Sequence, residues 1–160
     1  MAATAHASHG RAPAPQALNR LTFTATLHCL TGCAIGEVLG MVIGTALGWS
    51  DLQTVALAVA LAFVFGYSLT LIPLLRSGVL LASALPIAFA ADTVSIAVME
   101  VVDNAFMLLI PGAMDAGLSA FLFWGSLATA LAIAFLVAFP VNRWMIGRGR
   151  GHAVVHGSHH

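Results

Sequence analysis

The chain has 160 residues, of which 60% are hydrophobic and only 8% are charged; it contains no lysine and has a formal net charge of zero. Its mean hydropathy is +0.98. Soluble domains carry roughly 25% charged residues, so this composition excludes a soluble globular domain. It predicts a protein whose main partner is the lipid bilayer, and no nucleic-acid partner is expected.

Four apolar segments are long enough to cross a bilayer, which takes about 20 residues of helix. Clusters of glycine, proline, serine and aspartate separate them, as is typical of connections between helices. The sequence therefore predicts an all-α bundle of four transmembrane helices over residues 21–145, between a mobile tail at 1–20 and a basic, histidine-rich tail at 146–160. The expected spans are Phe23–Leu47, Leu52–Leu75, Val79 to a point between Val102 and Leu109, and Leu118–Phe139.

The arginines predict the orientation of this bundle. Four spans place both termini and the middle loop on one side, and all six arginines fall there: Arg11, Arg20, Arg76, Arg143, Arg148 and Arg150. The other two loops carry Asp51 and Asp115 and no basic residue. Because positive charge marks the cytoplasmic face, we expect a multi-pass protein of the bacterial inner membrane with both termini in the cytoplasm.

The first span carries a row of glycines at every fourth position. Residues four apart share a helix face, and glycines in such a row let two helices approach closely in lipid. The row predicts a glycine-zipper helix, whose partner is either another helix of the chain or the same helix of another subunit. Because four helices are few for a monomeric transporter, a homo-oligomer is expected, with this row as its contact. The row consists of Gly32, Gly36, Gly40, Gly44 and Gly48.

A second row on the first span combines Cys29, Cys33, Glu37 and Met41, with His28 beside it. Thiolate and thioether ligands suit Cu(I), and thiolate with imidazole suits zinc. Cysteine also packs well as a small apolar residue, so the pair alone does not define a site. Glu37 lies deep in the span, where a carboxyl group requires a partner, a cavity or an ion.

The third span carries further acids, Asp92 and Glu100, together with Met99. Counted from the expected helix starts, Asp92 and Glu37 reach the same depth, which predicts a shared site between the first and third helices. Pro86 is expected to kink this helix near its cytoplasmic end. Asp103 and Asn104 are expected at the membrane interface, in contact with solvent.

The other two spans contain hydroxyl groups but no intramembrane charge, and they are interpreted as scaffold. Pro73 and Pro140 are expected to kink or end their helices. Beyond the last span, His152 and His156 stand four apart and form a second possible metal site if that tail is helical.

Three motifs resemble a bacterial family of small four-helix membrane proteins whose domain has no assigned function. The first is His-Cys-x-x-Gly-Cys-x-x-Gly-Glu at 28–37, the second is the stretch 91–100, and the third is 140–144 followed by Gly151-His152. The resemblance covers about residues 22–156. Domains of this kind are found beside copper-oxidase-type domains, which implies a copper connection and a copper-handling partner protein.

Together these features predict a membrane protein that binds a transition-metal ion. The stronger form of this hypothesis is that the protein also translocates the ion. Copper is favoured over zinc. The proposed ligands are His28, Cys29, Cys33, Glu37, Asp92, Met99 and Glu100. Two alternatives stay open: an accessory subunit whose polar residues lock helices together, and proton-coupled transport without a metal. An enzyme is not expected, although thiol-redox chemistry at the cysteine pair remains an option.

Overall fold

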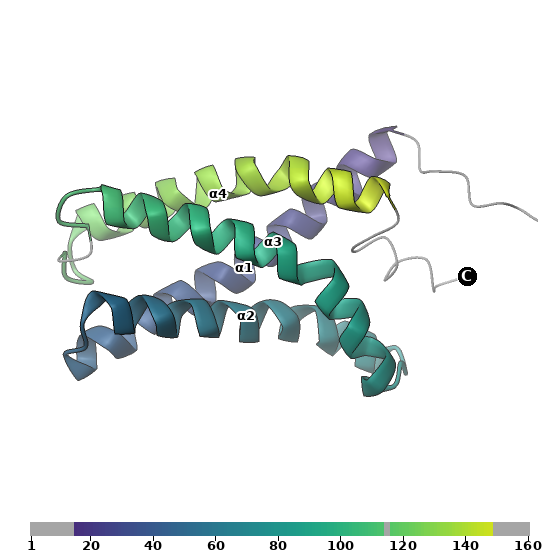
Figure 1. Cartoon of the computed structure of the whole chain (residues 1–160), viewed down its shortest axis with the longest axis horizontal. Coiled ribbons are helices and arrows are strands. Elements are labelled where there is room, and N and C mark those ends of the chain that lie inside the picture. The colour runs from purple at the N-terminus through teal and green to yellow at the C-terminus, as the bar shows by residue number, and fades with distance from the viewer. Residues whose placement is uncertain (1–14, 114–115, 149–160) are drawn as a thin grey trace, which may run out of the picture.

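The computed structural model describes residues 15–113 and 116–148, which form four α-helices (Figure 1). Three of them are long and apolar enough to cross a membrane, and the third in chain order passes the same test as a bent pair taken as one span. The all-α four-helix prediction is therefore confirmed, and the chain is a multi-pass integral membrane protein. The helices are α1 (Pro15–Leu47), α2 (Asp51–Arg76), α3 (Leu81–Leu109) and α4 (Phe121–Gly147).

Helix α1 begins at Pro15 instead of near Phe23, so residues 15–20, predicted to belong to the tail, are helical. Proline suits the first turn of a helix because it lacks only an N–H group that has no partner there. Further along, the Thr22 hydroxyl donates to the Leu18 carbonyl at 2.8 Å. The polar start of α1 thus extends beyond the apolar stretch from which the span was predicted.

Helix α4 also exceeds its predicted limits, because it passes through Pro140 and ends at Gly147. The segment after the proline is held by side chains of α4 that bond to other helices. The Arg143 guanidinium donates through Nε to Asn19 Oδ1 of α1 at 2.7 Å. Pro73 likewise lies inside α2, so neither proline ends its helix.

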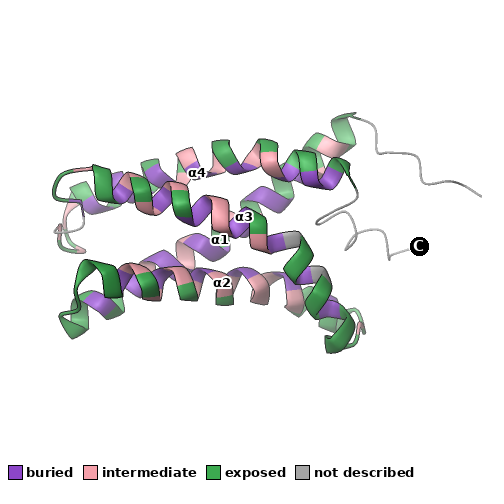
Figure 2. Ribbon diagram, in the orientation of Figure 1, coloured by how far each residue is buried: buried purple, intermediate pink, exposed green. Residues whose placement is uncertain are grey.

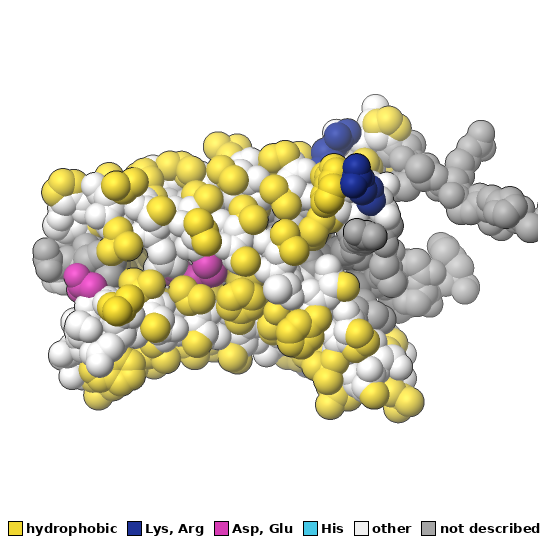
Figure 3. All heavy atoms as spheres, viewed as in Figure 1, with side chains coloured by type: hydrophobic (Ala, Val, Ile, Leu, Met, Phe, Trp, Pro, Cys, Tyr) yellow, Lys and Arg dark blue, Asp and Glu magenta, His cyan; other side chains and the backbone are white. Residues whose placement is uncertain are grey.

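The four helices alternate in direction, so that the start of α1, the end of α2, the start of α3 and the end of α4 lie at one end of the molecule (Figure 1). Helix α1 crosses behind the others, from the end of α4 to a hairpin with α2. Figure 3 shows basic side chains gathered at that end, with hydrophobic side chains covering the length of the bundle. The basic residues thus gather on one side of the bundle, as the sequence predicts, and the cytoplasmic location of that side stays a prediction.

The glycine row of α1 packs against α2 of the same chain. A Cβ atom added at Gly32 would lie 2.7 Å from the Gly66 Cα atom, and one at Gly40 would lie 2.5 Å from that of Ala58. Gly36 and Gly44 are equally close to α2, whereas Gly48 follows the helix with a φ of 65°, and a Cβ atom added there would meet nothing within 4 Å. The row is therefore an internal contact with α2, the first of the two partners that the sequence left open, and the homo-oligomer stays a prediction.

Helix α3 is bent by 44° between Leu81–Ala90 and Asp92–Leu109. The bend follows Pro86 by about one turn, further into the helix than predicted. Beside it, the Thr93 hydroxyl donates to the Phe89 carbonyl at 2.7 Å, and such bonds from threonine to the preceding turn bend helices. The bend tilts the start of α3 away from α4 and toward the end of α2 (Figure 1).

The exposed surface of the spans is apolar, as contact with lipid requires. Leu27 and Ile43 on α1, Val64 on α2 and Leu136 on α4 are all exposed. Buried residues follow the inward side of each helix (Figure 2). The acids of α1 and α3 lie on this inward side, although their side chains are the most polar in the spans.

Candidate functional site

Three carboxyl groups and one amide meet in the core between α1 and α3. They belong to Glu37 on α1 and to Glu100, Asp103 and Asn104 on α3, and we call them the carboxyl cluster. The Asn104 amide nitrogen donates to Glu37 Oε1 at 3.2 Å and to Glu100 Oε2 at 3.3 Å. It also donates to the Glu100 carbonyl at 2.9 Å. One amide therefore ties the two helices together at the level of the acids.

The carboxyl groups are close enough to influence one another electrostatically. Glu37 interacts in this way with both Glu100 and Asp103. The exposed fractions of the three acids are 3%, 4% and 1%. Two carboxyl groups in contact repel each other when both are ionised, and they can hydrogen bond only if one of them carries a proton. The arrangement thus requires protons or a cation among the three acids.

Other donors to these acids are scarce. Within residues 15–113 and 116–148, Glu100 Oε1 and both carboxyl oxygens of Asp103 have no hydrogen-bond partner. The chain has no lysine. A buried carboxylate oxygen without a donor is costly, so the cluster is built at the expense of stability, which is typical of a site with a function.

The two cysteines lie next to the cluster, toward the basic end of the bundle. Cys29 and Cys33 are free and fully buried, and they pack with Met99 in one core. Cys29 Sγ donates to Asp92 Oδ1 at 3.7 Å, and Cys33 lies against the carboxyl group of Glu100. The predicted ligands thus fall into two neighbouring groups: Asp92 pairs with Cys29, whereas Glu37 and Glu100 are joined through Asn104, with Met99 packed against the cysteines.

The seventh predicted ligand, His28, lies apart from both groups. Its ring interacts with the backbone of Leu69 on α2, because it stands one residue, about 100° of helical rotation, from Cys29. Over the described part of the chain, no three His, Cys, Asp or Glu side chains form a group suited to hold a metal ion. The described residues therefore give no support to His28 as a ligand beside the cysteines, and that role stays a prediction.

Asp92 and Glu37 do not share a level, contrary to the sequence prediction. Asp92 pairs with Cys29, about two turns from Glu37 along α1. The discrepancy arises because α1 starts at Pro15, so its residues sit further along the bundle than the expected start at Phe23 implies. Glu100, Asp103 and Asn104 take the place beside Glu37.

Asp103 was predicted at the interface and is instead buried with Glu37, while Asn104 is half-buried and bonded to both glutamates. The signal for Asp103 was present in the sequence, since it continues the helical face that carries Asp92 and Met99. It was outweighed by its position near the end of the apolar segment.

A separate polar network joins three helices near the basic end. The Asn142 amide of α4 donates to Thr26 Oγ1 of α1 and to Ser95 Oγ of α3, both at 2.9 Å. All three side chains are buried. We call this set the amide network; it was missed because the fourth span was expected to end at Phe139, before Asn142.

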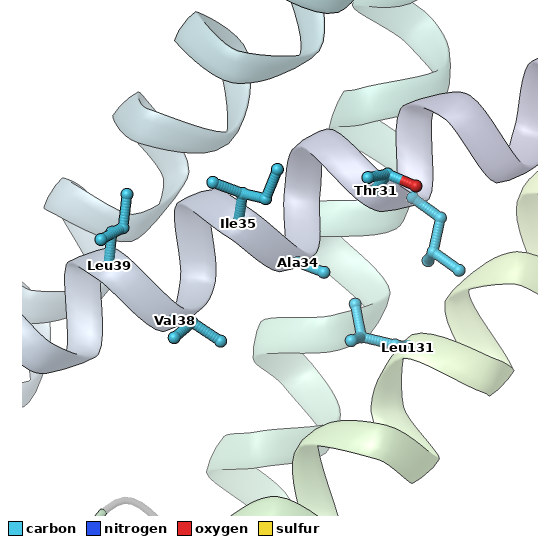
Figure 4. Close-up of a pocket in the computed structure, with 7 residues that line it drawn as sticks. Thr31, Ala34, Ile35, Val38, Leu39 and Leu131 are labelled. Carbon is cyan, nitrogen blue, oxygen red and sulfur yellow. The ribbon is translucent and has the colours of Figure 1, made fainter.

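A hollow of about 540 Å³ on the lipid side of α1 has no part in this site. It is lined mainly by aliphatic side chains of α1, together with Leu131 of α4 (Figure 4). None of its lining residues is charged, and the wall suits lipid acyl chains. The second possible metal site, His152 and His156, falls outside the described residues.

Helices of this length and hydropathy around a buried cluster of acids define the chain as a polytopic α-helical membrane protein. The domain of unknown function DUF4396 matches residues 19–151, and the chain belongs to this family. No curated protein and no solved structure matches the chain. The resemblance seen in the sequence is thereby supported at the level of the family, which carries no assigned activity.

Proposed function

We propose that the protein moves protons across the membrane, with the carboxyl cluster as the group that takes up and releases them. The observation that carries this proposal is the burial of Glu37, Glu100 and Asp103 in the core, where the Asn104 amide joins the two glutamates. Acids buried in membrane spans typically mark proton or ion pathways. A proton bridges two carboxyl groups without any ligand geometry, which suits a place that lacks an arranged metal site.

The neighbouring polar groups provide a path along the interface of α1 and α3. From the cluster toward the basic end, Cys33 lies next to Glu100, and Cys29 lies next to Asp92. Glu37 and Cys29 are about 12 Å apart along α1, at 1.5 Å per residue. Water molecules would bridge such a gap, since buried water binds where polar groups face one another.

Asn104 has a positioning role in this proposal. Its amide donates to Glu37 and to Glu100, so it holds the two acids at the distance over which a proton can pass. With both termini in the cytoplasm, the cluster lies toward the opposite face, with Glu100 about 14 Å and Asp103 about 9 Å of helix from the end of α3 at Leu109.

Proton movement can be measured in liposomes that contain the purified protein and a pH-sensitive dye. A potassium diffusion potential set by valinomycin drives protons inward, with Na⁺, K⁺, Zn²⁺ or Cu⁺ added as possible exchange ions. Glu37→Gln should abolish the protein-dependent change, while Asp51→Asn, an exposed acid in the first turn of α2, should preserve it. Failure to find movement that depends on Glu37 with any of these ions would overturn the proposal.

A second candidate, favoured by a separate observation, is a transition-metal site at the thiols. Cys29, Cys33 and Met99 pack together, and soft sulfur ligands suit Cu(I). Elemental analysis of the untagged protein in mild detergent tests this candidate. Stoichiometric copper or zinc that disappears in the Cys29→Ser/Cys33→Ser variant would support it, and a wild type free of metal after loading under reducing conditions would rule it out.

A further inference from the structure

The carboxyl cluster is reached from the side of the bundle through a crevice between α2 and α3. The crevice has a volume of about 320 Å³, within the range of roughly 300–1,000 Å³ for sites that take small organic ligands. Its walls are apolar, and two members of the carboxyl cluster lie among its lining residues, which are Val55, Val59, Phe63, Ala97, Glu100, Val101 and Asn104.

The crevice faces the region that lipid occupies. Val101 on its α3 wall is 70% exposed, and on the face shown in Figure 3 an acidic group is visible among hydrophobic side chains, away from the ends of the bundle. Glu100 is only 4% exposed, and its Oε1 atom lacks a hydrogen-bond partner among the residues that the structure describes. An acceptor oxygen without a donor therefore lies buried just beneath an apolar opening.

We propose that this crevice takes an amphiphilic organic cation from the bilayer and places its charged group against Glu100. The apolar walls favour a hydrophobic ligand over a hydrated inorganic ion, and the carboxyl group favours a cation over a neutral lipid. Phe63 contributes an aromatic ring at the wall, and such rings attract cations. The inference deepens the proposed proton function, since a proton and an organic cation would compete for the same carboxyl group and exchange across it.

Binding of tetraphenylphosphonium to the full chain tests the inference. The protein is placed in phosphatidylcholine nanodiscs, and bound probe is measured by equilibrium dialysis against empty nanodiscs. Saturable binding is expected, with at least about a tenfold loss of affinity in Glu100→Gln, because the paired charge is removed from a buried site. Tetraphenylborate, an anion of the same shape, should show no saturable binding.

A second variant keeps every acid in place and so covers the case in which Glu100→Gln fails to fold. Ala97→Phe fills the crevice and should also abolish binding, whereas Val94→Phe adds a phenyl ring to the exposed side of the same helix and should leave binding unchanged. Both variants are compared by thermal melting in the same nanodiscs.

The outcomes separate this inference from the proton function. Absence of saturable probe binding, or equal binding in wild type, Glu100→Gln and Ala97→Phe, would overturn the inference; proton movement that depends on Glu37 would then still stand. Binding that requires Glu100, without any proton movement that depends on Glu37, would instead leave the crevice as a binding site and remove the proton function.

Discussion

The carboxyl cluster and the amide network are both buried, polar and built across helices, yet they differ in how their groups are satisfied. In the amide network, the Asn142 nitrogen donates to two hydroxyl oxygens at 2.9 Å each, and no acid takes part. In the carboxyl cluster, one amide serves Glu37 and Glu100, while Glu100 Oε1 and both carboxyl oxygens of Asp103 lack donors over the described residues. The first arrangement is typical of residues that hold helices together, which we call a structural lock. The second is typical of a site that binds a proton or a cation.

This difference argues against the hypothesis that the protein is an accessory subunit whose polar residues only hold helices together. Polar side chains that only hold helices together are expected to be satisfied, because interhelical hydrogen bonds in membranes contribute about 0.6–2 kcal/mol each. The amide network meets that expectation and the carboxyl cluster does not. Variants in the two regions should therefore have opposite effects on stability and on proton movement.

The largest effect is expected for Glu37→Gln. Proton transfer through a positioned side chain contributes a factor of about 100 or more, so proton movement should fall at least that far. Because a neutral amide replaces an acid that interacts electrostatically with two others, the melting temperature should stay the same or rise. Dye-loaded liposomes and thermal melting of the same preparation give both values.

A lower melting temperature for Glu37→Gln with unchanged proton movement would reverse the assignment and make the carboxyl cluster the structural lock. Asp51→Asn provides the control, since it also converts an acid to an amide but lies exposed at the start of α2.

The next largest effect is expected for Asn142→Leu, on stability alone. Removal of the amide leaves Thr26 Oγ1 and Ser95 Oγ without their donor, at a cost of about 1–3 kcal/mol. Unfolding by sodium dodecyl sulfate in mixed micelles measures this loss. Val137→Leu, on the exposed side of α4, is the control and should be neutral.

Proton movement through folded Asn142→Leu should persist, because the amide network lies outside the carboxyl cluster. If movement is lost while the protein remains folded, Asn142 belongs to the pathway and the two regions are one functional unit.

The smallest effect is expected for Cys33→Ala. The thiol packs with Met99 and lies against Glu100, so its removal opens a small void and should cost about 1 kcal/mol in stability. Proton movement should remain within a few-fold of wild type. A loss as large as that of Glu37→Gln would show that the thiol, and not only the carboxyl groups, takes part in transfer.

The four helices could be predicted from the sequence, because the bilayer thickness sets the length of each apolar segment and glycine-rich breaks separate the segments. It also placed Glu37, Glu100 and the two cysteines in a common region between α1 and α3. It could not place Asp92 correctly, because the register between two helices depends on where each begins. The polar residues at 15–22 look alike in a helix and in a tail, so the start at Pro15 was not visible.

The packing partner of each helix could not be predicted from the sequence either. The glycine row predicts close approach but names no partner, and the structure assigns it to α2 through Gly66 and Ala58. Asn142 was missed for a related reason. Its role depends on a helix that continues past Pro140, and that continuation is supported by contacts with α1 and α3 that the sequence does not display.

The central claim, that the carboxyl cluster holds exchangeable protons, is tested most directly by infrared difference spectroscopy of the protein in lipid bilayers. The carbonyl band of protonated carboxyl groups is followed as the pH is lowered and raised, in H₂O and in D₂O. We expect a band that changes with pH, shifts in D₂O and is diminished in Glu37→Gln but not in Asp51→Asn. A spectrum in which Glu37→Gln and wild type show the same carboxyl band would contradict the claim.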